Sequence, residues 1–159
     1  AGIGTMTYYD PESGSFGALG HGITDVDTAQ LMSLGSGSIM ETTVKAVKKG
    51  EKGDPGELKG DFTVQRDVGT VTVNSDGGIF GTVSDASFPA QGEAVPVASA
   101  DEVTTGRAVI RTTVCGDEIR EYEVQIVKVY RDEDSTRNLL LRITDPELLQ
   151  TTGGIVQGM

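Results

Sequence analysis

Cysteine and histidine are nearly missing from this chain of 159 residues, which contains only Cys115 and His21. A single cysteine excludes an internal disulfide, and one cysteine with one histidine cannot supply the usual ligands of a zinc site. Tryptophan is absent and aromatic residues make up only 5% of the chain, so a folded core must be mainly aliphatic. We therefore expect no metal site and no cofactor.

Positive charge and long apolar runs are also in short supply. The chain has 13 lysines and arginines against 24 acidic residues, which gives a formal net charge of −11. Nucleic-acid binding needs clustered basic side chains, so we expect no nucleic-acid partner. No apolar run approaches the ~20 residues that cross a bilayer, and we expect no direct membrane span in this chain. No glycine pattern has the full spacing of a nucleotide-binding loop.

The chain is instead rich in glycine, at 22 positions, and in alternating apolar and polar residues. Alternation with a period of two is typical of half-buried strands, and turn residues separate these segments at short spacing. About ten short strands without a long helical stretch indicate an all-β fold, built as a barrel or a pair of packed barrels. We expect strands at Gly4–Tyr9, Ser15–His21, Thr43–Val47, Phe62–Gln65, Gly69–Val73, Ile79–Val83, Ala94–Ala98, Arg107–Val114, Ile119–Tyr130 and Asn138–Thr144.

One short helix is predicted near the end of the chain. Asp145 is a suitable N-cap, Pro146 fits the first helical position, and Gly153 can end the helix. We expect residues 1–159 to form one domain of two β-subdomains, with a seam near Ser84–Gln91.

His21 is the only residue that could serve as an imidazole base. It lies between Gly20 and Gly22 at the end of a predicted strand, where its ring is accessible to another molecule. Histidine is the default general base because it exchanges a proton near neutral pH. The competing interpretation is a structural histidine in a turn.

A serine–histidine–acid triad built on His21 needs a serine at a glycine-lined turn, whose N–H groups can bind an oxyanion. Ser36 and Ser38 lie in such a segment, although glycine and serine together are more typical of a flexible loop. The other glycine-lined turn, Gly153–Met159, contains no serine. The residues alone leave the orienting acid open among several carboxylates.

Four segments of the chain resemble one known family. They are GALGHGITDVDT at residues 17–28, GDPG at 53–56, ITDPELL at 143–149 and TGGIVQGM at 152–159. Over nearly its whole length the chain resembles the stage IV sporulation protein B (SpoIVB) serine peptidases. This resemblance implies a trypsin-like double β-barrel of short antiparallel strands, with one short helix near the C-terminus.

The resemblance also implies roles for individual residues. The family's general-base histidine falls on His21 and its essential aspartate on Asp145. The family's nucleophilic serine directly follows the GGIVQGM segment, so Gly158 lies two positions before it and would supply an oxyanion-hole amide. The chain as printed lacks this serine, and we expect it to be inactive by itself. Because Asp145 is also a good N-cap, Asp67 and Asp76 are kept as alternative orienting acids.

A function follows from the same resemblance. Members of this family are sporulation signalling proteases that cleave themselves and a membrane-bound regulator of an intramembrane protease, which leads to activation of a late sigma factor. They act outside the cytoplasm, between the two membranes around the forespore. Full-length members carry a membrane anchor and a PDZ domain ahead of the peptidase, and these 159 residues include neither. The alternative is a non-catalytic β-barrel module that binds a peptide strand by edge pairing or acts as a scaffold.

Overall fold

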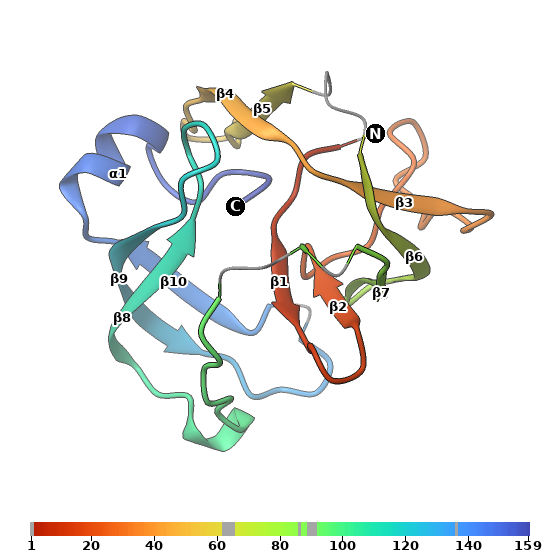
Figure 1. Cartoon of the computed structure of the whole chain (residues 1–159). Helices are drawn as coiled ribbons and strands as arrows, with labels where there is room; N and C mark the ends of the chain where they lie inside the picture. The colour runs from red at the N-terminus through yellow and green to blue at the C-terminus, as the bar shows by residue number, and fades with distance from the viewer. Residues whose placement is uncertain (1, 62–65, 86, 89–91, 136) are drawn as a thin grey trace. The chain divides into compact units, whose positions relative to one another are not determined.

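The computed structural model describes residues 2–61, 66–85, 87–88, 92–135 and 137–159, which form antiparallel β-sheets and one short α-helix near the C-terminus (Figure 1). The chain divides into two compact units. The first comprises Ala1–Thr43, Gly60–Gly92 and Gly158–Met159, and the second comprises Val44–Lys59 and Glu93–Gln157. Neither unit is therefore a continuous piece of the sequence.

The first unit contains a five-stranded antiparallel sheet with the strand order β1-β2-β7-β6-β3. Alternation along the strands directs apolar side chains into one core, which consists of Phe16, Ala18, Val71 and Ile79. The strands are β1 (Met6–Tyr9), β2 (Ser15–Ala18), β3 (Gly37–Met40), β6 (Asp67–Ser75) and β7 (Gly78–Val83).

The second unit contains a three-stranded antiparallel sheet in the order β10-β9-β8 and most of a two-stranded sheet, β4-β5. Tyr122 and Val124 lie on one face of β9 and are buried, as the period-two pattern predicts. The elements are β4 (Thr43–Lys48), β5 (Glu57–Asp61), a 3₁₀ turn η1 (Ala100–Glu102), β8 (Gly106–Thr112), β9 (Arg120–Val129), β10 (Leu139–Ile143) and α1 (Pro146–Thr152).

The predicted helix is confirmed at both ends. The Asp145 side chain accepts a hydrogen bond from the Leu148 N–H at 2.9 Å, and Pro146 occupies the first turn. The helix ends at Gly153, whose φ of 73° is left-handed and whose N–H donates to the Leu149 carbonyl. Leu148 is fully buried and fixes the inner face of α1. No helix in the described part of the chain is long and apolar enough to cross a membrane.

Some predicted strands need correction. Ala94–Ala98 forms no regular secondary structure, because its residues are exposed and Pro96 has no N–H for a ladder. The strand predicted at Phe62–Gln65 lies outside the described residues. The structure adds β3, which pairs Ser38 with Thr70 where a flexible loop was the favoured interpretation, and the largely polar β5. The other eight predicted strands coincide with β1, β2, β4 and β6–β10.

The all-β class with one short helix is confirmed, whereas closed barrels are not. Within the described residues the sheets are open, with β1 and β3 as the edge strands of the larger one. The expected seam at Ser84–Gln91 stays a prediction, because Ala86 and residues 89–91 lie outside the described residues.

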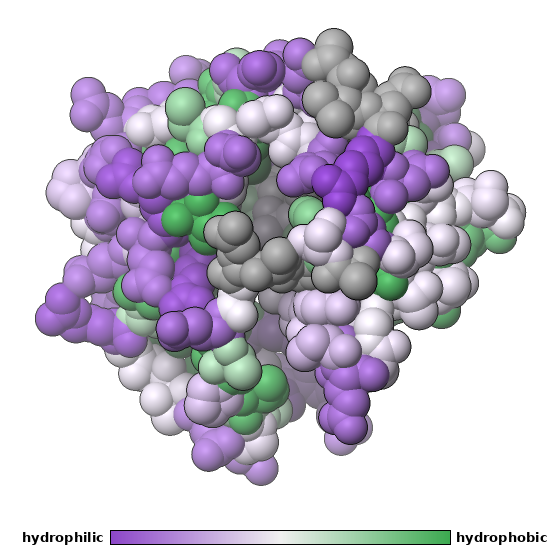
Figure 2. Space-filling view, in the orientation of Figure 1, coloured by the Kyte–Doolittle hydropathy of each residue, from purple (hydrophilic) through white to green (hydrophobic). Residues whose placement is uncertain are grey.

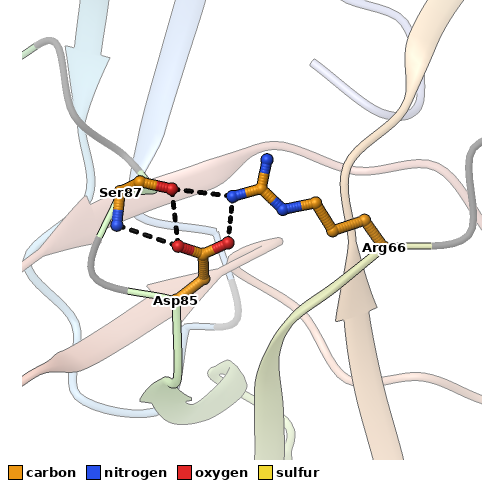
Figure 3. Close-up of polar contacts among 3 residues, drawn as sticks. All are labelled: Arg66, Asp85 and Ser87. Carbon is orange, nitrogen blue, oxygen red and sulfur yellow. Dashed lines mark hydrogen bonds and ion pairs between the residues drawn. The ribbon is translucent and has the colours of Figure 1, made fainter.

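An ion pair joins the two ends of the β6–β7 hairpin (Figure 3). Arg66, just before β6, pairs with Asp85, which follows β7. The Ser87 hydroxyl accepts from the Arg66 guanidinium at 2.7 Å and donates to Asp85 Oδ1 at 2.6 Å. The backbone also closes here, since the N–H groups of Ser84 and Asp85 both donate to the Val68 carbonyl.

Hydrophilic residues cover most of the face shown in Figure 2, in keeping with the net charge of −11. Exposed apolar side chains interrupt the hydrophilic surface, the most exposed being Val26 and Val97 at 98% and 95%.

Candidate active site

His21 lies in the turn that follows β2, with its side chain exposed. The turn begins with two left-handed residues, Leu19 at a φ of 73° and Gly20 at 66°. This conformation suits glycine but is uncommon for leucine, so the turn is held in an unusual backbone shape. Gly22 is needed on the other side for a different reason: a Cβ there would lie 2.6 Å from the Ser75 carbonyl oxygen. The two glycines around His21 therefore shape the turn that displays it.

The imidazole of His21 has one hydrogen-bond partner among the described residues, the Gly22 carbonyl oxygen, at 3.0 Å from Nδ1. A carbonyl oxygen only accepts hydrogen bonds, so Nδ1 must carry the proton in this contact. In the neutral ring Nε2 is then an acceptor, and no hydrogen bond to it occurs among the described residues. This is the tautomer that a general base requires.

The loop after His21 is held by Asn74, near the end of β6. Its Oδ1 accepts from the Ile23 N–H at 2.8 Å, while its Nδ2 donates to the Ile23 carbonyl at 2.9 Å and the Met32 carbonyl at 3.0 Å. No local pattern in the sequence marks Asn74 for this role, because it belongs to an Asn-Ser-Asp-Gly-Gly stretch that is sufficiently explained as a turn.

Asp25 organises the same loop from within. Its Oδ1 accepts from the N–H groups of Asp27 and Thr28 and from the Thr28 hydroxyl. These bonds, with the Thr28 N–H as the largest contribution, lower the pKa of the Asp25 carboxyl below its usual value. The Asp25 carboxylate therefore has a structural role in the loop.

Asp145 is the N-cap of α1 and is partly buried. The cap uses one carboxylate oxygen, Oδ1, which accepts from the Leu148 N–H. Among the described residues no group binds Oδ2. Because a carboxylate has two oxygens, the structural role leaves one oxygen available for a second hydrogen bond.

Gly158 lies in the terminal glycine turn with a left-handed φ of 96°. The preceding peptide is fixed because the Gln157 carbonyl accepts from the Leu58 N–H at 2.8 Å, and the Gln157 N–H donates to the Gly56 carbonyl at 2.8 Å. In a trans peptide the N–H points opposite to the carbonyl, so the Gly158 N–H has a set direction. It has no hydrogen-bond partner among the described residues and is available to an oxyanion.

Thr5 links Gly158 to the strand pair that carries His21. The Thr5 hydroxyl donates to the Gly158 carbonyl at 2.6 Å, and the Thr5 carbonyl accepts from the Leu19 N–H at 3.3 Å. Thr5 directly precedes β1 and Leu19 directly follows β2. Gly158 is therefore attached at the same end of the β1–β2 pair as the His21 turn. All four residues belong to the first unit, whereas Asp145 belongs to the second.

A family model described as SpoIVB peptidase S55 matches residues 1–159 of this chain. The chain belongs to the SpoIVB peptidase S55 family. The match covers the whole chain and confirms the family that the sequence motifs indicated. No curated protein and no solved structure matched the chain in the corresponding searches.

Of the alternative residues considered for an S55 site, Asp76 lies in a turn beside the His21 turn, because the carbonyl oxygen of the preceding residue, Ser75, lies 2.6 Å from where a Cβ of Gly22 would stand. Asp76 therefore stays an alternative orienting acid. Asp67 opens β6 opposite Met40, and Asp76 is exposed in the β6–β7 turn. Ser38 lies in β3, and Ser36 precedes that strand. Within the described residues no hydrogen bond or ion pair joins any of these side chains to His21.

Proposed function

We propose that this domain is the catalytic domain of a serine endopeptidase in which His21 is the general base and the Gly158 N–H is an oxyanion donor. Asp145 is the proposed orienting acid, and the proposed nucleophile is a serine directly after Met159. One observation carries the proposal: Thr5 attaches Gly158 at the end of the β1–β2 pair from which the His21 turn projects. Family membership supports the same roles.

The proposed reaction begins when His21 Nε2 removes the proton from the serine hydroxyl. The serine oxygen then bonds to the carbonyl carbon of a peptide, and the electron pair of the broken π bond moves to the carbonyl oxygen, facing the Gly158 N–H. The imidazolium returns its proton to the leaving amine as the C–N bond breaks. A water molecule, deprotonated by the same nitrogen, releases the acyl group and restores the serine.

The Nδ1–H of His21 is already donated to the Gly22 carbonyl, so the proposed acid has to share this N–H. In this proposal the carbonyl holds the tautomer, and the carboxylate of Asp145 adds the negative charge that stabilises the imidazolium.

We also propose, on the family membership alone, a trypsin-like double β-barrel for the domain and a role in sporulation signalling. Its substrates would be the protein itself and a membrane-bound regulator of an intramembrane protease, with late sigma-factor activation as the outcome. Its proposed location is the extracytoplasmic space around the forespore, and its proposed partner within the full-length protein is a PDZ domain.

The experiment is fluorophosphonate labelling of the protein carrying about twenty natural residues beyond Met159. We expect covalent labelling of the serine after Met159, and a labelling rate about 10²- to 10⁴-fold lower in His21→Ala, the usual contribution of a positioned general base. Asp134→Asn, an exposed turn residue, is the matched control and should label like the wild type.

Equal labelling of the folded wild type and His21→Ala would contradict the role of His21. A folded, extended protein that takes up no label at all would contradict the peptidase proposal and favour the peptide-binding module.

A further inference from the structure

The peptide between Gly22 and Ile23 connects two side chains that lie far apart in the sequence. Its carbonyl oxygen accepts from His21 Nδ1 at 3.0 Å, and its N–H donates to Asn74 Oδ1 at 2.8 Å. Because the C=O and N–H of one trans peptide point in opposite directions, a bond that fixes the N–H also fixes the carbonyl.

We propose that Asn74 is a positioning residue for His21 and acts through the Gly22–Ile23 peptide to hold the imidazole as its Nδ1–H tautomer. This inference rests on the proposed function of His21 as general base, but it is a statement about the resting protein. Asn74 touches neither the imidazole nor any reacting atom.

Three features of the Asn74 side chain carry the argument. It holds both polar groups of Ile23, so the peptide on each side of that residue is fixed. Its third bond, to the Met32 carbonyl, joins the two ends of the loop that His21 introduces. Finally, Asn74 is anchored in the β6–β7 ladder opposite Ile79, a buried residue of the first unit's core.

Asparagine suits this position because its carboxamide both accepts and donates. Aspartate retains an acceptor for the Ile23 N–H but has no donor for the carbonyls of Ile23 and Met32. Alanine retains neither the acceptor nor the donors. The two substitutions therefore separate the bond that orients the Gly22 carbonyl from the bonds that close the loop.

The tautomer can be read directly, because His21 is the only histidine in the chain. The ¹⁵N chemical shifts of the imidazole in the labelled protein, at a pH where the ring is neutral, distinguish a protonated Nδ1 from a protonated Nε2. This measurement needs no serine and no activity, so its failure is distinguishable from failure of the proposed function.

We expect the wild type to give the pattern of a protonated Nδ1. Asn74→Ala should shift the pattern toward a protonated Nε2, by at least a tenfold change in the tautomer ratio, whereas Asn74→Asp should stay close to the wild type. Asp25→Ala is the matched control: it also removes three hydrogen bonds from this loop, but none from the Gly22–Ile23 peptide, and should leave the tautomer unchanged.

A wild-type spectrum with a protonated Nε2 would overturn the inference, and this test needs no variant to fold. An unchanged tautomer in folded Asn74→Ala would overturn it as well. An equal shift in Asn74→Ala and Asp25→Ala would also overturn it, since it would trace the effect to general loosening of the loop.

Discussion

At the residue scale, His21 depends on residues both next to it and far from it in the chain. Gly20 and Gly22 flank it and shape its turn locally. Asn74 acts on this turn from 51 positions away, through a hairpin whose register decides where its side chain points. The Thr5–Gly158 bond spans 153 positions and could not be read from any local pattern. Such contacts depend on the completed fold.

The Arg66–Asp85–Ser87 cluster predicts a pH-dependent contribution to stability. Hydrogen bonds from Ser87, followed by that from Arg66, lower the pKa of Asp85 from 3.8 to about 2. A carboxyl whose pKa is lower in the folded state stabilises the folded protein fully at pH values above the pKa that it has in the unfolded state. This contribution is lost as the pH falls through the pKa of the folded state. We expect Asp85→Asn to be less stable than the wild type at pH 7. The difference should shrink as the pH falls from about 4 toward about 2.

Urea unfolding at a series of pH values measures this difference. Asp134→Asn removes an exposed carboxylate that makes no hydrogen bond within the described residues, and it should match the wild type throughout. A stability gap between Asp85→Asn and the wild type that stays constant from pH 7 to pH 2 would show that the ionised carboxylate is not its cause.

At the scale of elements, the segments that were predicted correctly carry their own signals. β9 alternates strictly, and α1 has an N-cap, a proline in its first turn and a glycine at its end. β3 and β5 carry no such signal, because both are rich in glycine or polar residues and owe their extended form to neighbours. Conversely, Ala94–Ala98 is a short apolar segment of the length of a strand but has no partner strand in the described structure. Pairing, which a local pattern does not encode, decides these cases.

The first turn of α1 separates two roles of Asp145. Asn caps a helix nearly as well as Asp, whereas Ala at an N-cap costs about 1 kcal/mol. We expect Asp145→Asn to keep the free energy of unfolding of the wild type and Asp145→Ala to lose about 1 kcal/mol. If Asp145 is the orienting acid, both variants of the extended protein should lose activity, by up to about 10⁴-fold.

Peptidase activity and urea unfolding, measured on the same two variants, distinguish the roles. Nearly full activity in Asp145→Asn would show that Asp145 acts only as the N-cap of α1. The orientation of His21 would then rest on the Gly22 carbonyl alone.

At the scale of the whole molecule, the two units are linked because the chain passes between them several times. The chain enters the second unit within β4, returns within β5, enters again at Glu93 and returns at Gly158. The β4–β5 pair has only two strands, and such a pair is marginally stable by itself. It is supported by the backbone bonds of Val44 to Gly116 and of Leu58 to Gln157. The same two strands lead into β3 and β6 of the first unit, so unfolding of either unit should disturb both.

This chain path predicts a single unfolding transition, testable with one buried residue. Val68 is completely buried in the first unit, and Val68→Ala should cost about 2 kcal/mol through lost burial and the cavity that remains. Residue-resolved amide signals during urea unfolding report on β7 in the first unit and β9 in the second. We expect the variant to lower both midpoints equally, and Val97→Ala, at a valine 95% exposed, to lower neither. A lowered midpoint in β7 with an unchanged one in β9 would mean that the units unfold independently, despite a chain that passes between them four times.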